Sequence, residues 1–301
     1  MKRVVSVSIG SSERNHRVEV DILGEPFVIE RIGTDGDMEK AVELIRELDG
    51  KVDAFGMGGI DLFIWAGSKR YTFRDGKKIF RAATKTPIVD GTGLKNSLER
   101  KVVNWIQDKG IIDFKGCKVL LTSGMDRFGM AEALVEHKAD LVLGDLMFAL
   151  GVPIPLHSLK TLHRLAAILA PIIVQLPFEL LYPTGQKQVK ESKPRFEEWY
   201  QWADVIAGDF LFIKRYMPKD LSGKTILTNT VTAKDVEDLK RRGVKRLITT
   251  TPELSGRSFG TNVIEGVLVT LADKPYNELT QEDYLELLER IGFEPRLEEL
   301  A

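Results

Sequence analysis

The sequence predicts an α/β protein with an N-terminal mixed α/β domain and a Rossmann-like domain built on a doubly wound parallel sheet. The main observation is a series of short apolar segments separated by helix-like stretches, as expected of strands buried on both faces of a parallel sheet. The length of 301 residues is typical of two domains or of one large α/β unit. The five strand segments are CKVLLTS (117–123), ADLVLGD (139–145), ADVIAGD (203–209), KTILTNT (224–230) and KRLITTT (245–251).

The domain boundaries follow from a change of pattern near residue 94. Residues 1–93 mix strand and helix signals and form the N-terminal domain, a possible substrate domain. Residues 94–110 carry apolar side chains at helical spacing and end at a glycine, which predicts a bridging helix. Residues 111–275 form the Rossmann-like domain, and 276–301 contain a C-terminal helix that docks back on the body.

Two hairpins are predicted in the first domain. RVEVDI (17–22) alternates apolar and polar residues and pairs with GEPFVIERI (24–32), whereas DLFIWAGSKRYTF (61–73) turns at Ala66–Gly67. The uncharged run 165–178 is shorter than the ~20 residues that a membrane span needs. We expect there a buried helix broken near Pro171 or a subunit interface, and a possible homodimer through the apolar region 146–182.

Composition excludes several classes of protein. The net charge of −1 does not favour binding of nucleic acid or of an anionic membrane. The single cysteine excludes a disulfide framework, and the four histidines lack the spacing of metal ligands, so no metal is predicted. The N-terminus lacks a signal-peptide pattern. We therefore predict a cytoplasmic protein with a small-molecule partner.

The segment VLLTSGMDRFGMAEALVEHKADLVLGD (119–145) resembles the start of a dinucleotide-binding unit. Gly124 and Gly129 hold the first and third positions of the GxGxxG pattern, and Asp145 follows at the distance of a ribose-binding acid. Such an acid favours NAD over NADP. Asp126 stands where the middle glycine is expected, beside Arg127. Asp126 either pairs with Arg127 beside the phosphates or caps the helix that follows. The alternative for the whole segment is a plain turn between strand and helix that binds no ligand.

Other polar residues follow strand ends, where ligands of open parallel sheets bind. Asp90 follows a strand with glycines after it, so it is a candidate for orienting a substrate hydroxyl or for a proton relay. The alternative for Asp90 is a helix cap. The remaining candidates form two groups. Those assigned to the nucleotide are Thr228, Asn229 and Thr250; those assigned to a substrate or anion are Gly58, Gly59, Asp61, Arg257, Ser258, Thr261 and Asn262.

The run VDGTGLKNSLERKVVNWIQDKGIIDFKGCKVLLTSG (89–124) resembles the domain junction of shikimate and quinate dehydrogenases. DAFGMGGIDL, DRFGMAEAL and TTTPELSGRSFGTNV resemble motifs of a bacterial family named quinate 5-dehydrogenase, over nearly the whole chain. The resemblance implies a two-domain enzyme that oxidises a cyclic polyol with NAD(P) through a lysine–aspartate pair. The aspartate matches Asp90, its lysine partner would be Lys85 or Lys95, and the substrate-binding serines would come from SVSIGSS (6–12). The family's N-V-T-x-P-x-K lysine motif has no counterpart.

The leading prediction is an NAD(P)-dependent oxidoreductase that acts on a small hydroxylated cyclic carboxylate similar to quinate or shikimate. The alternative is a non-redox transferase, or a protein that binds a nucleotide or phosphorylated ligand through Arg257 and the threonine-rich strand ends. A third possibility is an interaction protein whose region 146–182 is a dimer surface.

Overall fold

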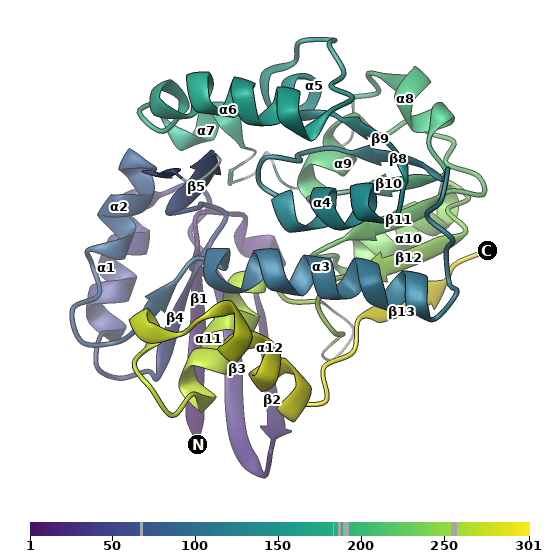
Figure 1. The fold of residues 1–301 in the computed structure, drawn as a ribbon. Helices are drawn as coiled ribbons and strands as arrows, with labels where there is room; N and C mark the ends of the chain where they lie inside the picture. Colours follow the sequence, from purple (N-terminus) through teal and green to yellow (C-terminus); the bar gives the residue numbers. More distant parts are fainter. Residues whose placement is uncertain (67–68, 183, 186–187, 189–192, 254–257) are drawn as a thin grey trace.

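The computed structural model describes residues 1–301 except 67–68, 183, 186–187, 189–192 and 254–257. It contains a five-stranded and a six-stranded sheet, joined by a long helix that runs between them (Figure 1). Most neighbouring strands in both sheets are parallel. The predicted α/β class is confirmed.

The first sheet has the strand order β2-β3-β1-β4-β7. Strand β2 pairs with β3 in the antiparallel hairpin that the sequence predicts, and the other neighbours are parallel. The second hairpin, β5–β6, also forms, but its turn at 67 lies outside the described residues. The elements are β1 (Lys2–Ser8), β2 (His16–Ile22), β3 (Glu25–Gly33), α1 (Met38–Leu48), β4 (Ala54–Gly58), β5 (Phe63–Ala66), β6 (Lys69–Thr72), α2 (Arg74–Phe80) and β7 (Ile88–Val89).

The second sheet has the order β13-β12-β11-β10-β8-β9, and all five predicted apolar segments form its parallel strands. Because β9 and β10 lie on opposite sides of β8, the strand order reverses there. Its elements are β8 (Lys118–Leu121), α4 (Phe128–Glu136), β9 (Asp140–Leu143), α5 (Asp145–Leu150), α8 (Glu197–Trp202), β10 (Val205–Ala207), α9 (Phe210–Tyr216), β11 (Thr225–Thr228), α10 (Ala233–Arg241), β12 (Arg246–Thr249) and β13 (Arg296–Glu299).

Two features of the second sheet differ from a complete dinucleotide-binding fold. After β9 the chain leaves the sheet through α5 and continues into α6 (Leu159–Ile173) and α7 (Phe178–Leu181), instead of adding a third strand beside β9. Helix α6 contacts the β5 hairpin of the first domain, as Figure 1 shows. At the opposite edge, β13 pairs antiparallel with β12. The sequence analysis recognised only a helix in the C-terminal tail.

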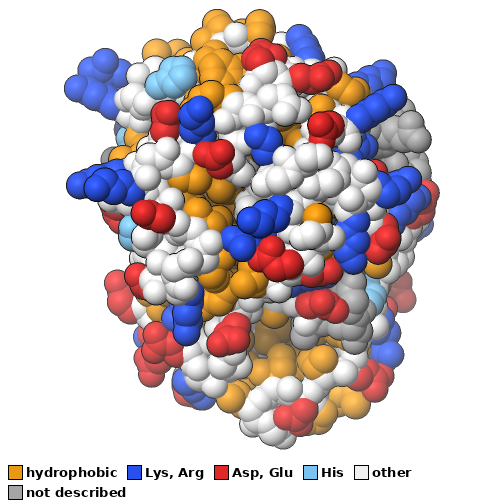
Figure 2. All heavy atoms as spheres, turned by 90° about the vertical axis from the view of Figure 1, so that its right-hand side faces the viewer, with side chains coloured by type: hydrophobic (Ala, Val, Ile, Leu, Met, Phe, Trp, Pro, Cys, Tyr) orange, Lys and Arg blue, Asp and Glu red, His pale blue; other side chains and the backbone are white. Residues whose placement is uncertain are grey.

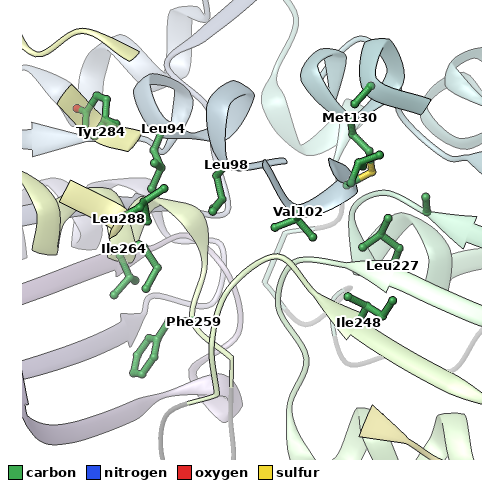
Figure 3. Packing of buried hydrophobic residues seen from close by; sticks show 14 of the residues in the cluster. Leu94, Leu98, Val102, Met130, Leu227, Ile248, Phe259, Ile264, Tyr284 and Leu288 are labelled. Carbon is green, nitrogen blue, oxygen red and sulfur yellow. The ribbon is translucent and has the colours of Figure 1, made fainter. Parts of the chain in front are cut away.

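Helix α3 (Thr92–Asp108) joins the two sheets, close to the predicted bridging helix 94–110. Leu94, Leu98 and Val102 are fully buried along it. Figure 3 shows Leu94 and Leu98 beside residues of the C-terminal helices, and Val102 closer to Leu227 of the second sheet. One hydrophobic core therefore continues through both domains.

Helix α11 (Thr261–Leu271) belongs with the first sheet, although the sequence analysis placed 111–275 in the second domain. It packs against β1 and β4, and Gly266 permits this approach because a Cβ there would lie 2.9 Å from Val4 Cγ1. Helix α12 (Gln281–Arg290) packs against α3 and α11. The chain thus crosses between the domains through α3, again before α11, and once more between α12 and β13.

Helix α6 continues through Pro171 instead of breaking there, and ends two residues later. One face of α6 and α7 exposes apolar side chains: Ile168 is 67%, Ile172 61% and Leu180 61% exposed. The homodimer through 146–182 stays a prediction. On the face drawn in Figure 2, acidic and basic side chains are intermixed. No helix within the described residues combines the length and apolarity that crossing a membrane requires.

The joint between α3, α11 and α12 contains a buried carboxyl group, that of Glu265. It accepts hydrogen bonds from the Gly91 amide (2.6 Å) and from the Tyr284 hydroxyl (3.0 Å). Burial and the nearby Asp90 raise the pKa of Glu265 to about 8. The neutral acid is therefore the form that the folded joint favours.

This shift predicts a pH-dependent stability. A pKa raised from 4.5 to about 8 gives a contribution that is complete below pH 4.5 and is lost as the pH rises through 8. We expect the free energy of unfolding to fall by up to about 1.4 kcal/mol per pH unit from this group. Glu265→Gln should remove this contribution to the pH dependence of the free energy of unfolding. Urea denaturation at a series of pH values between 5 and 8 measures that dependence for variant and parent. Identical slopes for variant and parent would contradict the assignment.

Candidate active site in the interdomain cleft

The carboxyl ends of both parallel sheets meet at a polar cleft between the domains. Ser8, Gly58 and Asp90 lie at the ends of β1, β4 and β7, while Asp209 and Asn229 follow β10 and β11. The cavity in this cleft has a volume of about 120 Å³. Its charged lining residues are Arg14, Arg31, Asp61, Asp90, Lys95, Asp126, Arg127 and Asp209. Acidic and basic groups are therefore balanced in the cleft.

Lys95 is the central cation of the cleft. It lies in the first turn of α3, which begins after Gly91 adopts a left-handed φ of 96°. Its Nζ lies 2.7 Å from Asp126 Oδ1 and 3.4 Å from Asp61 Oδ1. The lysine side chain is 10% exposed, whereas those of Asp61 and Asp126 are 29% and 27% exposed. An ammonium group in this position holds two carboxylates at the edge of the cavity.

These contacts separate the acidities of the two aspartates. Burial raises the pKa of Asp61 to about 7, against the opposing effect of Lys95. At Asp126 the effect of burial is outweighed by Lys95 and Arg127, which hold its pKa below the ordinary value. Burial lowers the pKa of Lys95, but Asp126 and Asp61 outweigh it and raise that pKa. Near neutral pH, Asp61 can accept or release a proton while Lys95 stays charged.

Arg127 connects the turn after β8 with α3 and with the end of β10 through ion pairs. Its side chain is 3% exposed and forms ion pairs with Glu99 of α3 and with Asp209, the latter at 3.2 Å. The pairing depends on Gly129, because a Cβ there would lie 2.3 Å from the Asn96 carbonyl oxygen. The glycine lets α4 approach α3 closely, which brings Arg127 onto Glu99.

Asp209 extends this network toward α7 and β11. Its carboxylate accepts hydrogen bonds from the Tyr182 hydroxyl (2.8 Å), the Asn229 side-chain amide (2.8 Å) and the Leu211 backbone amide (2.9 Å). The last of these caps α9. The carboxylate is thus fully satisfied and fixes the position of Asn229 at the cavity wall.

The part of the cleft wall at the start of α11 suits an anion. Helix α11 begins at Gly260, which provides no side-chain cap, and Thr261 and Asn262 follow on the cavity wall. Among the described residues, the Thr261 hydroxyl is buried without a hydrogen-bond partner. Arg31 lines the same cavity and donates to Ser8 Oγ at 2.8 Å. A helix N-terminus with nearby guanidinium groups attracts negative charge.

The structure separates the catalytic candidates. Lys95 lies in the cleft, whereas Lys85 is exposed and precedes β7, at the opposite end of that strand from Asp90. Asp90 lines the cavity, but its carboxylate accepts hydrogen bonds from the Leu62 backbone amide (2.7 Å) and from the Thr92 hydroxyl (2.6 Å). The carboxylates beside Lys95 are those of Asp126 and Asp61. The predicted pairing of Asp90 with a lysine is therefore replaced by these two contacts.

The glycine-containing turn does not have the form that a dinucleotide needs. The Asp145 carboxylate, predicted to bind ribose, accepts hydrogen bonds from the amides of Gly124 (3.0 Å) and Met125 (2.8 Å). The Asp126 carboxylate, where pyrophosphate would approach, is paired with Lys95. These residues do not fit NAD in the usual mode, although the cofactor itself stays a prediction.

The remaining predicted residues fall into two groups. Gly58, Gly59, Asp61, Asn229, Thr261 and Asn262 all line the cleft. Thr228, Thr250 and Ser258 are fully buried and do not line this cavity; Thr228 donates to the Gly208 carbonyl, and the Ser258 hydroxyl lies 3.1 Å from that of Thr249. The hydroxyls of Thr228 and Ser258 thus stabilise strand ends, whereas the buried Thr250 hydroxyl has no hydrogen-bond partner among the described residues. Arg257 lies outside the described residues.

Several site residues escaped the sequence analysis. Glu99 and Tyr182 are part of the buried network, and Arg14 and Arg31 line the cavity. Glu99 follows Lys95 by one helical turn, so its place on the same face of α3 was a usable signal. Arg31 and Tyr182 had no such signal, because only the folded chain brings them to the cleft.

The network predicts a large effect of Arg127→Met. The substitution leaves the buried carboxylates of Glu99 and Asp209 without their cation, so we expect a loss of about 3–5 kcal/mol in the free energy of unfolding. Arg100→Met is the matched control, because Arg100 pairs with Glu132 and Glu136 nearer the surface and should lose less than about 1 kcal/mol. Urea denaturation measures both, and equal losses would contradict the network.

Similarity to solved structures is low. A protein of Mycobacterium smegmatis in complex with β-D-fucofuranose is 12% identical, with 99% of each chain covered and a TM-score of 0.34. A solute-binding protein of Actinobacillus succinogenes with bound D-allose is 13% identical (95% of this chain, 100% of that chain, TM-score 0.36). The NAD-dependent malic enzyme of Thermotoga maritima is 11% identical (97% and 85%, TM-score 0.33). These similarities carry no argument about a ligand.

Sequence comparison identifies families for both parts of the chain. No curated protein matches the sequence. The model of a domain of unknown function, DUF8753, matches residues 3–90, the region of the first sheet. A second model, DUF8754, matches residues 93–300, which make up more than half of the chain. The chain therefore belongs to the family of the domain of unknown function DUF8754.

Proposed function

We propose that the interdomain cleft binds a small hydroxylated carboxylate, and that Asp61, with Lys95 and Asp126 beside it, exchanges a proton with one of its hydroxyl groups. The observation that carries this proposal is the contact of the Lys95 ammonium with both carboxylates at the cavity edge, at 2.7 and 3.4 Å. The resemblance to quinate and shikimate dehydrogenases supports the same class of substrate.

Two parts of the cleft lining support such a ligand. Carboxylates accept hydrogen bonds from hydroxyl groups, and Asp61 and Asp126 are partly exposed to the cavity. The start of α11 and the positive charge of Arg31, which line the same cavity, suit the carboxylate of the ligand. A hydroxy acid bound in the cleft thus meets complementary groups for its hydroxyl and for its carboxylate.

The same residues account for the proton transfer. Lys95 keeps its proton, so it donates a hydrogen bond and stabilises negative charge that develops on the hydroxyl oxygen of the ligand. Asp61, whose pKa is near 7, accepts the hydroxyl proton. Asp126 stays ionised and holds Lys95 in position.

The resemblance implies that NAD oxidises the bound hydroxyl group. This redox step rests on the resemblance alone and stays a prediction. The residues of the turn after β8 do not fit the cofactor in its usual mode, because Asp145 and Asp126 are engaged in contacts of their own. Proton transfer at a hydroxyl group serves non-redox reactions as well. The hydride acceptor is therefore tested separately below.

Lys95→Met tests ligand binding. Quinate, shikimate and gluconate are tested in a thermal-shift assay, and at least one of them should raise the Tm of the parent protein. Loss of a charged hydrogen-bond donor should weaken that binding about tenfold to hundredfold. Lys85→Met is the matched control, because Lys85 is exposed and does not line the cleft, and should bind as the parent does.

Three outcomes would contradict the proposal. No shift with any hydroxy acid would exclude the proposed class of ligand. An equal shift in parent and Lys95→Met would remove Lys95 from the site. A shift with a phosphorylated sugar alone would favour the non-redox alternative, in which the start of α11 binds phosphate.

The variant Asp126→Gly tests whether the protein binds NAD at the turn after β8. The substitution restores the middle glycine of the dinucleotide pattern and removes a carboxylate from the path of the pyrophosphate. If Asp126 is what keeps a dinucleotide out, the variant should bind NAD more tightly than the parent in isothermal titration calorimetry. NAD binding by the parent that the variant loses would show that Asp126 belongs to the cofactor site.

A further inference from the structure

A second and larger cavity shares a wall with the cleft. Its volume is about 800 Å³, within the range of small-molecule sites. Asp90, Lys95 and Asp126 line both cavities, so the Lys95–Asp126 ion pair forms part of the shared wall. The β5–β6 hairpin, α3, α4, α6 and α12 supply most of the other lining residues.

Aromatic rings are the main feature of this second cavity. Phe128 and His163 stack with their ring centroids 4.4 Å apart and an interplanar angle of 29°. Trp65, on the hairpin, is 49% exposed in spite of its size. Exposed aromatic faces in a cavity favour a flat, unsaturated ligand, because stacking adds to the burial of apolar surface. The aromatic lining residues are Phe63, Trp65, Phe80, Phe128, His163, Tyr276 and Tyr284.

Arg70 gives the cavity a positive group at the hairpin. Its guanidinium carbon lies 4.1 Å from the centroid of the Phe63 ring and 5.8 Å from that of Trp65. Arg70 is exposed, and within the described part of the chain it forms neither an ion pair nor a side-chain hydrogen bond. A guanidinium group fixed on an aromatic face keeps its N–H donors for an anion.

We propose that this second cavity binds an aromatic ligand that carries an anionic group, with its ring against Trp65 and its anion at Arg70. The ring would then lie beside the Lys95–Asp126 pair, on the other side of the wall from the hydroxy acid. Only this last placement rests on the proposed function, since the aromatic cavity and Arg70 do not depend on it. A nucleotide and an aromatic carboxylate share the required chemistry.

Tryptophan fluorescence tests whether the aromatic ring of the ligand lies against Trp65. Adenosine monophosphate and phenylacetate represent the two sources, and ribose 5-phosphate is an anion without an aromatic ring. With excitation at the red edge of tryptophan absorption, at least one of the aromatic ligands should quench the emission saturably. Trp65→Phe should remove this quenching, whereas Trp199→Phe should keep it, because Trp199 lies on α8 beside Trp202 and does not line the cavity.

The variant Arg70→Gln tests whether the anionic group of the ligand binds at Arg70. It should weaken binding of the same ligand about tenfold, while Arg46→Gln, an exposed change on α1, should leave it unchanged. No quenching by either aromatic ligand, quenching that survives Trp65→Phe, or equal binding of ribose 5-phosphate would each overturn the proposal. Quenching without any thermal shift from a hydroxy acid would support this cavity and reject the proposed function of the cleft.

Discussion

The pairing of buried charges around Arg127 is the interaction on which the cleft depends. Taking a guanidinium and several carboxylates out of water costs several kcal/mol per ion, and only close pairing offsets that cost. Arg127 meets this condition through Glu99 and Asp209, which belong to α3 and to the end of β10. Since these elements come from the bridging helix and from the middle of the second sheet, their pairing fixes where Lys95 and Asp126 lie.

The cleft combines this rigid charge network with unequal acidities. Carboxylates that share one set of cations need not titrate alike, because burial and pairing act in opposite directions on each. Asp126 is held ionised by two cations, whereas Asp61 reaches a pKa of about 7. Such a separation is what proton transfer needs, since one group remains a fixed charge while the other exchanges a proton.

The sequence predicts the architecture better than the site. Apolar runs and helical spacing identify the parallel strands and α3, because burial on a sheet or helix face leaves a periodic trace. They do not show that α11 packs on the first sheet or that β13 joins the second, since both depend on long-range contacts. In the same way, Asp145 has the spacing of a ribose ligand, yet its carboxylate binds the turn after β8. Spacing along the chain cannot reveal which donor a carboxylate meets.

The central claim is that a hydroxy acid lies across the cleft, with hydroxyl groups at Lys95 and Asp61 and its carboxylate at the start of α11. A crystal structure of the protein soaked with quinate tests it most directly. The account predicts density for the ligand between Lys95 and Asn262, with a hydroxyl oxygen within hydrogen-bond distance of Lys95 Nζ. A cleft that stays without quinate at saturating concentration, or quinate bound elsewhere with Lys95 still enclosed by its two aspartates, would contradict it.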